Sequence, residues 1–358
     1  MNLENKTLNN FTSTGIKFWL HQEQMFSYKE GTGRSVVSTH VSPESICNLR
    51  CSYCSVDNRD ISKHIKIEVV KDYIEKLQSR GLKAVIITGG GEPTLYKKFN
   101  ELVQWIKYDR GLDVALITNG TCFRLIKPET FKAFSWIRMS LNIFPDWEAK
   151  TGVDFLHNHI DSGCVIGASM VVETKDELTT QEVEDGVKLL KRIGKVADKI
   201  GAEYIRLLPN CRLKKDELDI KHNTLDTVIE RLEDERFFHQ YKNHRVPVDK
   251  VCHQSYFRPY LSEVPYQGST EPGSVYPCDS VVLNKNYQHF ADEYQICKPE
   301  DILDFMDNKG NFNYVDPTKQ CNGCVFTDTV EMLGKWKRGE LDLTDQYKDI
   351  NIVHKNFI

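Results

Sequence analysis

The 358-residue sequence lacks any apolar run near the roughly 20 residues that a membrane-spanning helix requires. Its first residues, MNLENKTLNNFTSTG, also lack the apolar core of a secretion signal. The chain has 47 basic and 51 acidic residues, a formal net charge of −4, so it lacks the overall positive field that would indicate nucleic acid or an anionic membrane as a partner. These absences predict a cytoplasmic protein that does not bind membranes.

Cysteine, in contrast, is plentiful. A chain without an export signal would keep its eleven cysteines reduced, so metal ligation or burial explains them better than disulfides do. Three of them, Cys47, Cys51 and Cys54, lie within the stretch CNLRCSYCSV. A structural zinc site usually takes four protein ligands, whereas three leave a position open for water, substrate or cofactor. The stretch therefore predicts an open metal site; a zinc site completed by His40 or His64, or three buried thiols, are the alternatives.

Strands and helices are predicted to alternate over the first 210 residues. Six apolar strands are expected, at residues 35–42, 83–88, 113–121, 135–143, 164–172 and 204–210. The intervening helices are expected at residues 67–81, 99–111 and 183–201. Such alternation predicts an α/β fold with parallel strands and right-handed crossovers, in which ligands bind beyond the carboxyl ends of the strands. The cysteine loop follows the first of these strands.

A glycine-rich turn follows the second strand. It consists of Gly89, Gly90, Gly91, Glu92 and Pro93. Taken alone it could be an ordinary turn between a strand and a helix, because glycine is common wherever the backbone bends tightly. Together with the order Cys-x3-Cys-x2-Cys and an aromatic residue, Tyr53, just before the last cysteine, the turn resembles the GGEP motif of the radical S-adenosylmethionine (radical SAM) enzymes.

That resemblance implies a partial (β/α)6 TIM-like barrel and two cofactors. The three cysteines would bind three irons of a 4Fe-4S cluster, and the amino and carboxylate groups of SAM would bind the fourth. Backbone carbonyls of the glycine turn would accept from the SAM ammonium, since glycine lets the main chain approach closely. The cofactor-binding residues implied are Tyr53, Gly90, Gly91, Glu92, Pro93, Asn119, Ser140 and Arg206. Asn119 and Ser140 could equally be turn residues, and Arg206 could be a surface ion pair.

The resemblance also implies the chemistry. A reduced cluster would cleave SAM to methionine and a 5′-deoxyadenosyl radical, which abstracts hydrogen from a substrate. The electron would come from a flavodoxin- or ferredoxin-type donor. The protein would hold a substrate C–H bond near C5′ and exclude other hydrogen donors.

A second group of cysteines lies near the C-terminal end, after Val246, where the sequence becomes richer in Pro, Gly, Tyr and Cys. Four of them, Cys252, Cys278, Cys321 and Cys324, resemble the ligands of the auxiliary-cluster domains called SPASM and twitch. The longer SPASM pattern continues with further cysteines, and none follows residue 324 here. The resemblance therefore implies one auxiliary 4Fe-4S cluster; structural zinc at the same four thiols is the alternative.

The remaining cysteines are expected to be buried thiols. They are Cys122, Cys164, Cys211 and Cys297. For Cys297, a place in the second metal site stays open. Asp279 directly follows Cys278 in the stretch YPCD, which resembles anaerobic sulfatase-maturating enzymes and implies a catalytic base; a turn aspartate is the alternative.

The predicted organisation has five parts. They are an N-terminal segment at 1–34, the radical SAM partial barrel at 35–215, a connecting helical region at 216–246, a smaller cysteine-rich auxiliary-cluster domain at 247–330, and a tail at 331–358. The polar stretch that begins at Arg212 is expected to be a linker or surface loop, followed by an amphipathic helix that ends near Arg236. The expected function is dehydrogenation or carbon-centred rearrangement of a small polar metabolite or a peptide side chain. The alternatives are radical modification of a nucleotide, a nucleobase or a ribosomal peptide, and a non-enzymatic zinc or iron-sulfur protein.

Overall fold

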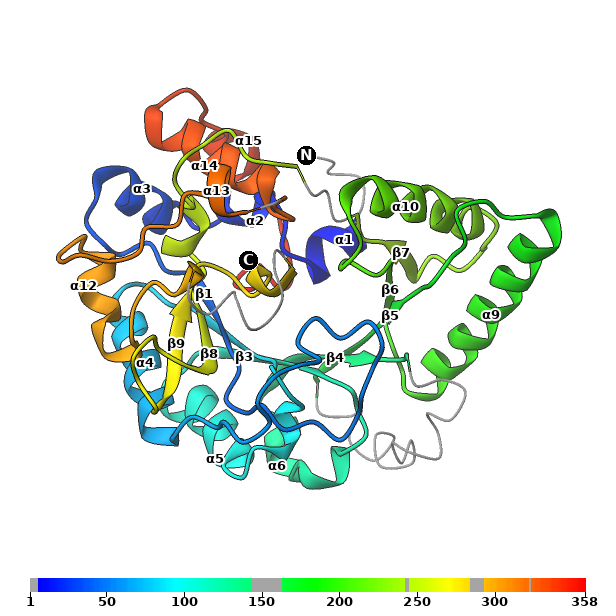
Figure 1. Cartoon of the computed structure of the whole chain (residues 1–358), viewed down its shortest axis with the longest axis horizontal. Coiled ribbons are helices and arrows are strands. Elements are labelled where there is room, and N and C mark those ends of the chain that lie inside the picture. The colour runs from blue at the N-terminus through cyan, green and yellow to red at the C-terminus, as the bar shows by residue number, and fades with distance from the viewer. Residues whose placement is uncertain (1–5, 143–162, 242–244, 284–292, 322) are drawn as a thin grey trace.

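The strands of the computed structural model form a single curved sheet, lined on its outside by helices (Figure 1). The structure describes residues 6–142, 163–241, 245–283, 293–321 and 323–358. Its strands are β1 (Ser38–Val41), β2 (Ala84–Ile87), β3 (Asp113–Thr118), β4 (Phe134–Ser140), β5 (Val165–Val171), β6 (Tyr204–Leu208), β7 (Phe237–His239), β8 (Tyr260–Pro265) and β9 (Pro272–Tyr276). The strand order is β7-β6-β5-β4-β3-β2-β1-β8-β9.

All neighbouring pairs from β7 to β8 are parallel, and the last pair, β8 and β9, is antiparallel. Helices connect the parallel strands in the described parts of the chain: α4 (Ile67–Ser79), α5 (Phe99–Gln104), α6 (Pro128–Phe131), α9 (Thr180–Lys199) and α10 (Lys215–Ile229). Parallel strands need such crossovers, which place helices on one side of the sheet and leave the other side as the lumen of a barrel. The predicted six parallel strands are all present, and the α/β partial barrel is confirmed.

Local sequence explains why these helices form. In α4, Val70, Tyr73, Ile74 and Leu77 recur at helical spacing and are fully buried against the sheet. The helix is followed by Gly81, whose φ of 106° is one that a residue with a side chain rarely adopts. In α9, the side chains and backbone of Thr179 and Glu182 form a reciprocal capping box.

Two expectations were wrong in the region after β6. The polar stretch that begins at Arg212, predicted as a linker or surface loop, contains the first turns of α10, which ends at Ile229 and not near Arg236. The chain then adds β7, which pairs with β6 and extends the parallel part of the sheet by one strand. Strand pairing on the other edge joins β8 to β1, so the cysteine-rich C-terminal part continues the same sheet.

The remaining elements gather at the gap between the two ends of the sheet (Figure 1). They include α1 (Lys6–Phe11), α2 (Gly15–Trp19), α3 (Gln22–Glu30), α13 (Pro317–Gln320), α14 (Thr327–Arg338) and α15 (Thr344–Tyr347). Helix α12 (Ile302–Met306) instead packs beside α4 on the outside of the sheet. Segments from the two ends of the sequence share one apolar cluster, in which the rings of Trp19 and Trp336 lie 5.2 Å apart edge to face. Within the described residues, no helix is both long enough and apolar enough to cross a membrane.

The last residues of the chain enter the lumen. Phe357 is 4% exposed and packs edge to face against Trp136 of β4, with ring centroids 5.3 Å apart. Both side chains belong to a small apolar cluster with residues of β2 and β3. This end of the lumen is therefore filled by side chains, and the polar groups described below lie in the remaining space.

Candidate active site at the carboxyl ends of the strands

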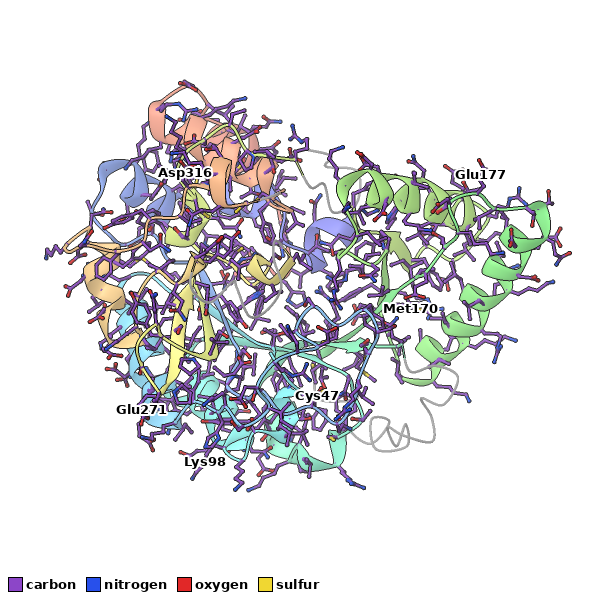
Figure 2. All side chains as sticks on the ribbon, in the orientation of Figure 1. Cys47, Lys98, Met170, Glu177, Glu271 and Asp316 are labelled. Carbon is purple, nitrogen blue, oxygen red and sulfur yellow. The ribbon has the colours of Figure 1, made fainter. Side chains whose placement is uncertain are left out.

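The cysteine loop leaves β1 and crosses in front of β3 and β4 in the view of Figure 1; Figure 2 labels Cys47 on it. Two arginines hold the loop. Arg59 donates to the carbonyl oxygens of Ser45 and Val56, each at 2.7 Å, and lies 3.5 Å from the Cys54 sulfur. Arg212, which follows β6, donates to the Cys54 carbonyl at 2.9 Å. Neither arginine could be identified from the sequence, because the side chains meet the loop only through folding.

The glycine turn packs directly on the residues that precede Cys47. The backbone N–H of Gly91 donates to the Glu44 carbonyl, at 2.9 Å, and that of Glu92 donates to the Ile46 carbonyl, at 2.7 Å. A Cβ atom on Gly91 would lie 2.0 Å from the Ile46 carbonyl oxygen, a distance that real contacts do not reach. The turn therefore needs glycine so that the two loops can approach each other.

Glu92 fastens the end of β2 to the end of β3. Its carboxylate is 2% exposed and accepts hydrogen bonds from the Thr94 backbone and hydroxyl, the Thr118 hydroxyl and the Asn119 backbone. Burial raises its pKa, while these hydrogen bonds act in the opposite direction. Pro93 opens the 3₁₀ turn that follows. Glu92 thus holds the backbone of the expected SAM-binding turn.

Asn119 and Ser140 lie at the carboxyl ends of β3 and β4, as predicted, and both reach the cysteine loop. The Asn119 amide donates to the Asn48 side chain at 3.0 Å and lies 3.8 Å from the Cys47 sulfur. Ser140 and Cys51 are hydrogen-bonding neighbours of the Tyr53 phenol, whose pKa is raised chiefly by burial. The structure therefore brings these polar residues together with the three-cysteine loop.

Arg206 lies deeper, inside the lumen. One of its terminal nitrogens donates to the Gln240 side chain at 2.9 Å. It lines a cavity of about 80 Å³ with Arg138, Arg258 and Asp279. Burial and the neighbouring Arg138 lower the pKa of the Arg206 guanidinium to about 9. It is not a surface ion pair, which was the alternative.

A second cavity brings together the four cysteines expected to be auxiliary ligands. It is lined by residues that include Cys252, Cys278, Cys321 and Cys324. No three or more His, Cys, Asp or Glu side chains in the described part of the chain are arranged so that they could hold a metal ion as they stand. The four thiols share one cavity and would have to close further on a bound cluster or ion. Four cysteine thiolates suit either a 4Fe-4S cluster or zinc.

Asp279 lies between the two cavities, because Cys278 lines one and Asp279 the other. One carboxylate oxygen accepts from Arg258 at 3.0 Å, and the other lies 3.3 Å from Nδ1 of His40. Burial lowers the pKa of His40, and the nearby Asp279 opposes that effect. Asp279 thus lies in a turn, and its carboxylate is flanked by Arg258 and His40 at the edge of the lumen.

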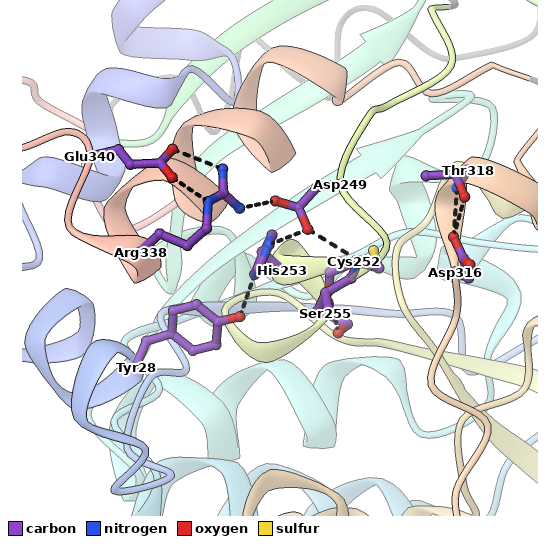
Figure 3. A network of polar contacts seen from close by, with 10 residues as sticks. Tyr28, Asp249, Cys252, His253, Ser255, Asp316, Thr318, Arg338 and Glu340 are labelled. Atoms are coloured by element: carbon purple, nitrogen blue, oxygen red, sulfur yellow. Dashed lines mark hydrogen bonds and ion pairs between the residues drawn. The ribbon is translucent and has the colours of Figure 1, made fainter.

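A polar network supports the segment around Cys252 (Figure 3). Asp249 lies 3.1 Å from Nε2 of His253 and accepts from Arg338 at 2.6 Å. The other ring nitrogen of His253 lies 2.5 Å from the hydroxyl of Tyr28 in α3. The network therefore ties this cysteine segment to α3 and to the end of α14.

The other four cysteines are free thiols. Cys122, Cys164 and Cys297 are buried, at 8%, 8% and 1% exposure, as expected. Cys297 belongs to the main apolar core. Cys211, also expected to be buried, is only partly so.

Comparison with known proteins gives relatives and a fold match. Over 109 residues the chain is 31% identical to an S-adenosylmethionine-dependent nucleotide dehydratase of Selenomonas ruminantium, a match that covers 30% of this chain and 38% of that protein. Over 230 residues it is 25% identical to a probable GTP 3′,8-cyclase of Pyrococcus abyssi, covering 61% and 74% of the two chains. The chain thus spans well under two thirds of the first of these relatives.

The crystal structure of Streptococcus suis SuiB bound to S-adenosylmethionine is similar in fold, with a TM-score of 0.50 and 14% sequence identity. That match covers 75% of this chain and 65% of SuiB. The family model of the radical SAM superfamily matches residues 41–146, which hold the cysteine loop, the glycine turn, Asn119 and Ser140. Residues 41–146 of this chain therefore form a radical SAM domain.

Proposed function

We propose that the protein cleaves SAM reductively and removes a hydrogen atom from a small polar substrate held in the lumen. The observation that carries the proposal is the convergence of three loops at the strand ends. The glycine turn is hydrogen-bonded to the segment before Cys47, and Asn119 reaches the Cys47 sulfur. The match of residues 41–146 to the radical SAM superfamily supports a 4Fe-4S cluster and SAM at this position.

The thiols of Cys47, Cys51 and Cys54 would hold the cluster, with one iron left for SAM. When bound, the reduced cluster supplies an electron to SAM, which yields methionine and a hydrogen-abstracting 5′-deoxyadenosyl radical. The chain's own residues position the reactants. Tyr53 lies in the cysteine loop and Ser140 lies beside it. The backbone carbonyls of Gly90 and Gly91 offer acceptors for the SAM ammonium.

For the second half of the reaction, we propose dehydrogenation of a small polar metabolite or a peptide side chain, with rearrangement as the alternative. A substrate radical that becomes an oxidised product must lose one electron and one proton. Cys252, Cys278, Cys321 and Cys324 would hold an auxiliary 4Fe-4S cluster suited to take up the electron. Asp279 lines the lumen cavity and would accept the proton.

A nucleotide is the second candidate substrate. The two relatives are named for nucleotide chemistry, and the lumen of this chain carries several arginines that could meet phosphate groups. Both candidates involve the same proposed radical chemistry at the strand ends. They differ in the chemical group of the substrate that the lumen recognises.

The test is formation of 5′-deoxyadenosine from SAM with dithionite under anaerobic conditions. Cys51→Ala should abolish it, because two thiolates cannot hold the cluster in place. Cys164→Ala, which removes a buried thiol outside both cysteine groups, should retain it. A Cys51 variant that cleaves SAM at the wild-type rate, or purified protein that holds zinc and lacks absorbance near 400 nm, would overturn the proposal.

A further inference from the structure

The lumen cavity has an unusual balance of charge. Its cationic side chains come from different elements: Lys17 from α2, Arg138 from β4, Arg206 from β6, and Arg258 from the segment before β8. Among the described residues that line it, Asp279 is the one carboxylate side chain. Burial of charge is unfavourable unless the charge is paired, so such an excess suits a cavity that binds an anion.

The cations are buried, so solvent does not compensate for the excess. Arg138 is 5% exposed and Arg258 is 4% exposed. Lys17 is 1% exposed, and burial together with the charges of Arg138 and Arg258 lowers its pKa well below the usual value. Burial is the larger cause of this shift, and the positive charges of Arg138 and Arg258 act in the same direction.

Some of their hydrogen-bonding capacity is already used. Arg138 donates from Nε to the Tyr204 hydroxyl at 3.0 Å, and Arg258 donates to Asp279 and to a main-chain carboxylate oxygen of Ile358, the last residue of the sequence. Lys17 donates to two backbone carbonyls. These contacts orient the side chains, but only one of them, the contact with Asp279, brings a carboxylate side chain.

Other donors of the cavity have no partner within the described part of the chain. They are the Nε atoms of Arg206 and Arg258. Each is buried and belongs to a side chain that lines the cavity. A buried donor without an acceptor costs roughly 1–3 kcal/mol, so a ligand that supplies acceptors here would be stabilised.

We propose that this cavity binds an oxyanion group of the substrate, a phosphate or a carboxylate, through Arg206, Arg138 and Arg258. Guanidinium groups suit this role because their planar donors match two oxygens of one oxyanion. The bound oxyanion group would lie next to Asp279. It would thereby hold the adjoining part of the substrate between the expected SAM site and Asp279. The proposal names a substrate feature and so rests on the proposed function.

The experiment titrates the anaerobically reconstituted full-length chain with sodium pyrophosphate and, separately, with sodium malonate, at constant ionic strength, by calorimetry. We expect saturable binding of at least one probe, and sodium chloride as a control should give none. Tighter binding of pyrophosphate assigns a phosphate group to the substrate, and tighter binding of malonate assigns a carboxylate. Binding of neither probe would overturn the proposal.

Variants locate the binding site. Arg206→Gln should weaken binding by roughly tenfold or more, because a charge-assisted hydrogen bond is lost. Arg231→Gln, at an exposed position of the chain beyond α10, should leave it unchanged. Asp279→Asn should strengthen binding, because it removes the competing carboxylate, and this holds even if the Arg206 variant folds poorly. Equal affinities in all these proteins would refute the assignment.

One further variant separates this proposal from the proposed function. Cys51→Ala removes a cluster ligand and leaves the lumen cationic, so it should lose SAM cleavage but bind the anion as the wild type does. If the wild type binds the anion but never cleaves SAM, the cavity assignment stands and the proposed SAM cleavage is wrong. If it cleaves SAM but does not bind the anion, the radical chemistry stands and the cavity assignment is wrong.

Discussion

At the scale of single residues, the most informative position is Asp279. The sequence placed it next to a cysteine, and the four-residue likeness YPCD implied a base. The structure adds its neighbours: Arg258 at 3.0 Å and His40 at 3.3 Å, from distant segments of the chain. A local motif could not reveal these partners, because they meet Asp279 only when β1 and β8 pair side by side.

Asp279→Asn tests its proposed role as proton acceptor. The amide keeps the size and part of the hydrogen bonding but cannot take a proton, so the variant should still form 5′-deoxyadenosine while losing most turnover to product. The measurement compares the two products in one anaerobic reaction once a substrate is identified. An Asn variant that makes product at an undiminished rate would show that Asp279 positions the arginine only, and oxidation would lose support against rearrangement.

At the scale of elements, the sequence predicted the motif-bearing loops better than the elements beyond them. The cysteine loop and the glycine turn carry their own signals, since spacing and glycine are local properties. Helix α10 carries no such local signal. Its buried face consists of Leu218, His222, Leu225 and Val228. A buried histidine in the second position breaks the apolar periodicity, so the first turns resembled a polar linker.

The contact between the glycine turn and the cysteine loop gives a prediction at this scale. Gly91→Ala places a methyl group against the Ile46 carbonyl oxygen, so it should destabilise the fold by roughly 1–3 kcal/mol and weaken SAM binding. Gly194→Ala is the matched control. That glycine lies inside α9, its added Cβ would be no nearer than 3.4 Å to a neighbouring atom, and alanine favours helix by about 0.5–1 kcal/mol.

Urea unfolding of the two variants beside the wild type measures the difference. We expect midpoints that move in opposite directions. If Gly91→Ala unfolds at the wild-type midpoint and binds SAM normally, the two loops do not need the close approach seen in the structure.

Strand β8 contributes a buried acid that the sequence did not single out. Glu263 is 0% exposed, and its carboxylate accepts from the Ser42 hydroxyl at 2.6 Å, while that hydroxyl accepts from the Gly90 backbone. Burial raises the pKa of Glu263 to about 7. The side chain lies so close to the glycine turn that a Cβ atom on Gly90 would be 1.8 Å from its Oε1 atom.

The raised pKa predicts how stability depends on pH. Between the ordinary glutamate pKa of about 4.3 and about 7, the folded chain holds a proton that the unfolded chain has lost, so the free energy of unfolding falls as pH rises through this window. The loss reaches roughly 3–4 kcal/mol above pH 7. Glu263→Gln stays neutral and should remove this dependence, making the variant more stable than the wild type at pH 8. Urea midpoints at pH 6 and pH 8 measure it; identical pH slopes for both proteins would contradict the prediction.

At the scale of the whole molecule, one sheet runs from β7 to β9 across the boundary expected near residue 247. The change in composition there predicted a boundary between two domains, which stays a prediction. It could not show that β8 would pair with β1, since strand pairing between distant segments leaves no local signal. The same holds for the lumen, where residues near both ends of the sequence meet strands of the barrel.

The two cysteine groups predict the metal content of the whole chain. If three thiols hold one 4Fe-4S cluster and four hold another, anaerobically reconstituted protein should contain about eight irons, and about four after Cys47, Cys51 and Cys54 are all changed to alanine. Cys297→Ala is the control: its thiol is 1% exposed in the main apolar core and does not line the cavity of the other four, so this variant should keep about eight. Iron and zinc analysis of each protein decides the outcome. Zinc in the triple variant would assign the second site to a structural metal, and a loss of about four irons from the Cys297 variant would place that thiol among the ligands.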